Sequence, residues 1–216
     1  MSEGWTGLVL LGVLVVLAWT NVRDHKKWAV LWDSVKRLRL GQQTMRDDIS
    51  LRDRGWIALQ VAAMLLVGLF VHQWTAWVGV ASGWSFFLVA LGGVVGITAA
   101  QLLLIRVTGW FFEMDSGLGE YLYTCLLLFI AFALLLLPVS IVAAYLPWAR
   151  HAALLVGACM LLAMVVYRWF RAAVIGLAQG MGLRAIFIYI CALEIMPAAL
   201  AAQAIAQYAR SIPEPV

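Results

Sequence analysis

Long apolar segments dominate this sequence and constrain its fold more than any other feature. Six of them cover residues 5–22, 56–78, 84–105, 121–146, 150–167 and 185–208. An α-helix needs about 20 apolar residues to cross the hydrocarbon core of a bilayer. Membrane β-strands are shorter and alternate in polarity at every second residue, so these runs exclude a β-barrel. The sequence therefore predicts an all-α membrane bundle with about six transmembrane helices.

The composition agrees with a single membrane domain over residues 1–216. Hydrophobic residues make up 65% of the chain and charged residues only 12%, whereas about a quarter of the residues of a soluble domain are charged. Six spans use nearly the whole length. No segment remains for a sizeable soluble catalytic domain.

Basic residues are distributed asymmetrically between the segments that join the spans. If the chain starts outside, thirteen of its fifteen lysines and arginines fall on the cytoplasmic side, as the positive-inside rule requires. They are Arg23, Lys26, Lys27, Lys36, Arg37, Arg39, Arg46, Arg52 and Arg54 after the first span, Arg106 after the third, and Arg168, Arg171 and Arg184 after the fifth. Residues 1–4 carry no basic side chain, unlike the start of a cleaved signal peptide. We expect both termini outside.

The cytoplasmic loop 23–55 contains an amphipathic pattern. Apolar residues recur at steps of three and four from Trp28 to Leu38, which predicts an interfacial helix whose apolar stripe lies in acyl chains. Its expected contacts with anionic inner-leaflet lipids are Lys26, Lys27, Trp28, Trp32, Lys36, Arg37 and Arg39. The alternative is a docking surface for a cytoplasmic partner.

The segment 106–120 lacks the amphipathic pattern of the first loop and is rich in glycine. Gly109, Gly117 and Gly119 are expected to interrupt any simple helix, and whether the segment re-enters the membrane stays open. Arg106 is close enough in sequence to pair with the acidic residues of this loop, which are Glu113, Asp115 and Glu120.

Glu194 is the most informative single residue, because it lies near the middle of the sixth span. Inserting a charge there costs about 2.5–3.5 kcal/mol, so such residues are paired, protonated or functional. Pro197 removes a helical hydrogen bond beside it. One interpretation is a proton or cation site; the other is a neutral carboxyl that fixes packing. Its candidate partners are Gln60, Gln101, Arg106 and Arg168.

Other residues in the spans suggest packing. Gly92-x-x-x-Gly96 and the alanines at 198, 202 and 206 allow close helix approach, within the bundle or in an oligomer. Pro138 is expected to kink the fourth span, and His72 to lie at headgroup level, where water reaches it. The three cysteines are isolated in apolar runs, so they predict neither a disulfide nor a metal site.

The last span carries a resemblance to a known family. The segment Phe187-Ile-Tyr-Ile-Cys-Ala-Leu-Glu-Ile-Met-Pro197, together with 102–112 and 136–138, resembles an uncharacterised inner-membrane family of Bacteroidota, a domain of unknown function. Ile190 and Ala192 depart from its usual Leu and Thr. The resemblance implies an address in the bacterial inner membrane. With the orientation expected from the basic residues, both termini would then lie in the periplasm. It adds weight to Tyr189, Glu194, Pro197 and Arg106 as a candidate intramembrane site.

No nucleotide fingerprint, catalytic triad or metal cluster is visible in the sequence. We therefore expect no cofactor, no metal and no nucleic-acid partner. The favoured function is a non-enzymatic accessory or assembly component of an envelope complex, with a membrane-protein partner or a homo-oligomer. The alternatives are a small proton- or ion-coupled transporter component using Glu194, and a lipid-modifying membrane enzyme using inner-face polar residues.

Overall fold

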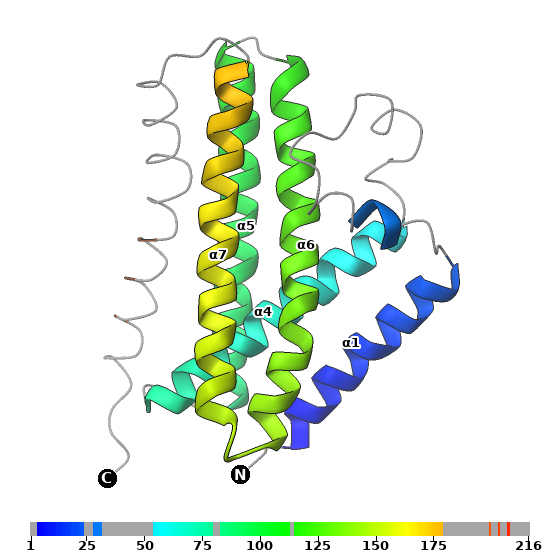
Figure 1. The fold of residues 1–216 in the computed structure, drawn as a ribbon, viewed down its shortest axis with the longest axis vertical. Coiled ribbons are helices and arrows are strands. Elements are labelled where there is room, and N and C mark those ends of the chain that lie inside the picture. Colours follow the sequence, from blue (N-terminus) through cyan, green and yellow to red (C-terminus); the bar gives the residue numbers. More distant parts are fainter. Residues whose placement is uncertain are drawn as a thin grey trace.

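A computed structural model describes residues 4–23, 28–31, 54–79, 83–112 and 115–178, together with Ala199, Gln203 and Gln207. Every regular element in these ranges is a helix. Five are long: α1 (Gly4–Arg23), α4 (Arg54–Val78), α5 (Trp84–Phe112), α6 (Asp115–Tyr145) and α7 (Arg150–Ala178) (Figure 1). Each contains a stretch that is long and apolar enough to cross a membrane. The predicted all-α membrane bundle is confirmed.

Helix α4 is the centre of the described bundle. It packs against α1, α5, α6 and α7, and it is the most buried of the five spans. The closest helix pair is the hairpin of α6 and α7. Figure 1 shows α5, α6 and α7 running nearly parallel, while α1 and α4 cross them obliquely. This arrangement gives α4 a neighbour on each side, whereas α1 and α5 lie at the edge.

The core has two parts, which meet at α4. On one side Leu59 and Phe70 of α4 pack with Leu127 of α6 and Leu154 of α7. On the other side α4 packs with α1 and α5 through Leu10, Val13, Leu66, Leu69 and Phe87. Lipid is as apolar as these side chains, so close packing rather than exclusion of water holds such helices together.

Close packing is tightest where α7 crosses α4. A Cβ atom added to Gly157 would lie 2.6 Å from Cζ of Phe70 and 3.1 Å from Cγ1 of Val139, well inside van der Waals contact. Gly68 of α4 is similar, because a Cβ there would lie 3.3 Å from Cα of Leu91 on α5. These two glycines allow the backbone of one helix to approach its neighbour.

The ends of α5 and α6 nearest residues 113 and 114 differ from the sequence prediction. Gly109, Gly117 and Gly119 lie inside α5 and α6, so the expected interruption of the helix by these glycines is wrong. Only residues 113 and 114 between the two helices lie outside the described ranges. A glycine costs about 1 kcal/mol in a helix, which is less than leaving backbone groups unpaired near the hydrocarbon.

Helix α7 also continues beyond its predicted end at residue 167, to Ala178. Its residues Arg168, Arg171 and Gly176 therefore belong to the helix and not to a third inner loop. Helices α5, α6 and α7 have 29, 31 and 29 residues, which corresponds to about 45 Å. Because the α6–α7 turn at Leu146–Ala149 is short, the extra length of these helices extends past α1 and α4 at the end of the bundle opposite this turn (Figure 1).

Part of the predicted interfacial helix is described, at residues 28–31, and it is helical. Leu31 is only 4% exposed and packs in the core with Trp56 and Tyr123, while Trp28 packs partly against the same cluster. The expectation that this apolar stripe lies in acyl chains is therefore wrong for Leu31. The other predicted lipid contacts, Lys26, Lys27, Trp32, Lys36, Arg37 and Arg39, lie outside the described residues.

Candidate functional site

Two arginines are buried in the C-terminal part of α7. Arg168 is 9% exposed and Arg171 only 2%, and Arg171 is among the largest fully buried side chains of the described residues. Three residues apart on a helix, they lie on neighbouring parts of one face. The sequence prediction placed both in a cytoplasmic loop. They are buried because α7 remains helical there and packs against α6.

Arg168 connects α7 to α5. Its Nη1 atom donates a hydrogen bond to Oε1 of Gln101, at 3.5 Å. Gln101 and Arg168 were candidate partners of Glu194, and the structure brings these two together. Helices α5 and α7 are not among the closely packed pairs, so this polar contact is a specific link between them.

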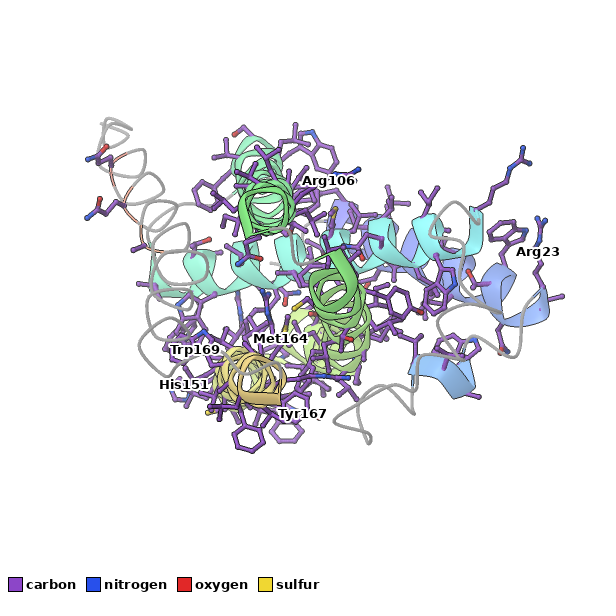
Figure 2. The ribbon with its side chains drawn as sticks, turned by 90° about the horizontal axis from the view of Figure 1, so that it is seen from above. Arg23, Arg106, His151, Met164, Tyr167 and Trp169 are labelled. Atoms are coloured by element: carbon purple, nitrogen blue, oxygen red, sulfur yellow. The ribbon has the colours of Figure 1, made fainter. Side chains whose placement is uncertain are left out.

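Arg171 is buried at the level where α6 carries Tyr123 and Thr124. Counted from the short α6–α7 turn, Arg171 and Thr124 stand the same number of residues along their antiparallel helices, which places them at one level. Thr124 is 1% exposed and Tyr123 is 4% exposed. Beside the arginines, the indole Nε1 of Trp169 is buried and donates to no atom of the described residues. Figure 2 shows Trp169 and Tyr167 on different sides of α7.

Of the other residues of the predicted site, only Arg106 is described, and it does not join this cluster. Arg106 is exposed and projects from α5 on a side that does not face α7 (Figure 2). Gln60 has a buried Nε2 with no hydrogen-bond partner among the described residues. Tyr189, Glu194 and Pro197 lie outside the described residues. Their proposed role in the membrane therefore remains a prediction.

Arg171 is the functional candidate that the sequence reading missed. A signal was present, since the residues after it, Ala172 to Ala178, are apolar or small and extend the span. With that extension, two arginines fall inside one apolar helix. Two arginines in a single span are rare and expensive, which marks them for attention.

A second polar centre lies at the other end of the bundle, where the structure corrects the prediction for His72. His72 is only 4% exposed, so water does not reach it as expected. Its ring lies 5.0 Å from the ring of Trp5 and 6.3 Å from that of Phe87. Next to it, Nε2 of Gln73 donates to the backbone oxygen of Ser140 at 3.1 Å. His72 is buried because α4 is covered by α1 and α5 at this level.

The described residues contain no group of three metal-ligating side chains. Cys125 is buried and Cys159 exposed, and neither forms a disulfide within the described residues. Asp115 and Glu120, at the start of α6, are the only acidic residues in the described ranges. The charged side chains whose burial the structure describes as nearly complete are Arg168 and Arg171, and both lie on α7.

Comparison with known proteins gives one result. No curated protein and no solved structure matches this chain. The model of one protein family matches residues 6–205, nearly the whole length, including the helices that carry the buried arginines. The chain therefore belongs to the family described as a domain of unknown function (DUF4271).

Proposed function

We propose that this protein is a non-enzymatic accessory or assembly component of an envelope complex, which packs against another membrane protein through α5. The observation that supports the proposal is the open face of α5. This helix is the least buried of the five spans, although it carries the sequence pattern that favours close helix contact.

The open face combines small and apolar residues. Gly92 and Gly96 are exposed, and a Cβ added to either would meet no atom of the described residues within 4 Å. Leu88, Val95 and Leu103 on the same helix are 48%, 42% and 64% exposed. Glycines four residues apart form a shallow surface on which the backbone of a second helix packs closely. Gly68 and Gly157 serve such contacts inside the protein, whereas Gly92 and Gly96 are available for a partner.

Filling this surface is expected to remove the partner without unfolding the protein. The variant Gly92→Leu/Gly96→Leu should purify in the normal amount, because the added side chains enter open space. At least about tenfold less partner protein should co-purify with this variant in mild detergent. A tenfold loss of affinity requires a loss of only about 1.4 kcal/mol of binding free energy. Quantitative mass spectrometry of the co-purified proteins is the measurement.

The matched control is Gly12→Leu in α1, where a Cβ also meets nothing within 4 Å. It should keep the full complement of co-purified proteins. Equal recovery from the α5 variant and from Gly12→Leu would contradict the proposed role of this face. A wild-type protein that purifies alone would contradict the accessory function itself.

We also propose that the protein resides in the bacterial inner membrane with both termini in the periplasm. The basic residues support this orientation, and two exposed side chains at opposite ends provide a test. Trp148 lies in the α6–α7 turn and is 82% exposed. In a variant that lacks the native cysteines, a cysteine introduced by Trp148→Cys should react with a membrane-impermeant maleimide in intact cells. Arg106→Cys should react only after permeabilisation. The reverse pattern would overturn the orientation.

A small proton- or ion-coupled transporter is the second candidate, and the buried arginines on α7 favour it. Ionisable groups inside a bundle often mark ion pathways. Together with Glu194, Arg168 would provide groups of opposite charge along such a path. Ion flux into liposomes that contain only this purified protein would support transport over the accessory role. Liposomes without flux, at full protein incorporation, would count against it.

A further inference from the structure

The sixth predicted span, residues 185–208, is described at three positions, and these share one exposed face. Ala199, Gln203 and Gln207 are each helical and exposed. Residues four apart lie one above the other on the same face of a helix. We propose that these three residues, named the glutamine face below, form the surface on which a second copy of this chain docks. The inference does not rest on the proposed accessory function, which concerns the face of α5.

The polarity of the glutamine face is the first argument. The other residues from 198 to 206 are alanine, leucine and isoleucine. Gln203 lies five residues before the predicted end of the span at residue 208, which is about 8 Å inside it at 1.5 Å per residue. An amide in hydrocarbon without a hydrogen-bond partner is costly, and glutamine lacks the long stem by which lysine and arginine reach the interface. The face therefore favours a protein neighbour over lipid.

The chemistry of the amide selects the neighbour. A carboxamide has two N–H donors and a carbonyl acceptor, so two identical side chains can each donate to the other. Copies of one chain insert into the membrane in the same orientation, which their basic residues determine, and a twofold dimer uses the same patch on both subunits. Its axis then follows the membrane normal. Gln203 and Gln207 meet their equivalents at equal depth, so a second copy satisfies both side chains.

Small residues beside the glutamines allow this approach. Ala199 lies on the face itself, and Ala202 and Ala206 directly precede the two glutamines in the chain. Interfaces between membrane helices combine such small residues with side chains that hydrogen-bond across the contact, glutamine among them. The exposed face of α1 is different, because it carries leucines such as Leu8 and Leu11. Lipid accommodates those side chains, whereas it offers no hydrogen bond to an amide.

The first test measures the mass of the full-length protein in mild detergent by size-exclusion chromatography with light scattering. The wild type should be a dimer. Gln203→Leu/Gln207→Leu should dimerise at least about tenfold more weakly, a loss of about 1.4 kcal/mol, and keep the wild-type unfolding midpoint because both side chains are exposed. The matched variant Gln203→Asn/Gln207→Asn retains the amides and should remain a dimer. A monomeric wild type, a dimeric leucine variant or equal losses in both variants would overturn the proposal.

The second test is cysteine cross-linking in the membrane, which identifies the neighbour. In a variant without the native cysteines, Ala199→Cys leaves both glutamines in place and should form a disulfide-linked dimer under a mild oxidant. Leu14→Cys in α1 is the control, because Leu14 is 47% exposed and, like Ala199, lies nine residues from the end of its predicted span. It should stay monomeric. Equal cross-linking at both positions, or cross-linking of Ala199→Cys to a different protein, would overturn the proposal.

The dimer and the accessory function are separable in the same samples. The leucine variant of the glutamine face should lose the second copy and retain the proteins that co-purify through α5. A wild-type dimer that purifies without any other protein would support the docking of a second copy while contradicting the accessory function.

Discussion

The variant Gly157→Leu is expected to be unable to form the native bundle. A single added Cβ at this position would already overlap the ring of Phe70 and press against Val139. Overpacking by a methylene or two costs about 1–3 kcal/mol, and a leucine adds four carbon atoms where the first has no room. The better helix propensity of leucine returns at most about 1 kcal/mol. We expect most of the protein to elute as aggregate in size-exclusion chromatography.

Gly12→Leu is the matched control for this variant. It makes the same chemical change within a long helix, at a position where a Cβ meets nothing within 4 Å. It should elute and unfold like the wild type, or be slightly more stable. A Gly157→Leu protein with a wild-type elution profile would show that α7 does not approach α4 as described here.

The variant Trp5→Ala is expected to release α1 from the bundle. Trp5 is the ring that joins this helix to its neighbours, with centroid distances of 5.0 Å to His72, 5.2 Å to Trp84 and 5.2 Å to Phe87. Trp5 is half-buried, and removing a packed tryptophan costs up to about 3–5 kcal/mol. The buried residues of α1 are only Thr6, Leu10, Val13 and Thr20. The measurement is the thermal midpoint of the purified protein, combined with proteolysis of the segment that follows α1.

Trp19→Ala provides the control in the same helix. Trp19 is 45% exposed, and its described ring contact is with the guanidinium of Arg23, at 5.5 Å. This variant should lower the midpoint by no more than about 2–4 °C, corresponding to about 1 kcal/mol. If both tryptophan variants lose the same stability, the aromatic contacts at the outer end do not hold α1.

The all-α membrane fold could be predicted because it follows from local properties. A run of 20 apolar residues in lipid has to satisfy its own backbone, and a helix does so within one segment. The same reasoning failed at the inner ends, where glycine propensity was given too much weight. Gly109 and Gly117 are accommodated in long helices because the helix is maintained by its hydrogen bonds, not by the preference of single residues.

The candidate site could be predicted only in part, because burial depends on which helices meet. Gln101 and Arg168 were recognisable as polar residues in or near apolar segments, and they do form a hydrogen bond. The burial of Arg171 and His72 was not recognisable, since each side chain is covered by a different helix of the bundle. Gly92 and Gly157 look alike in sequence, yet one lies open and the other is tightly packed.

The unequal heights of the helices have a consequence for the surrounding lipid. Helix α1 has 20 residues and crosses the bundle obliquely (Figure 1), so the apolar band that it presents is shorter than its axial length of about 30 Å. The candidate span of α7 has 25 residues and stands more upright. Lipids adapt to such mismatch by stretching or thinning at a cost of fractions of a kcal/mol per Å. The bilayer should therefore be thinner beside α1 than beside α7, so that neighbouring proteins with short spans are drawn to one flank of the molecule.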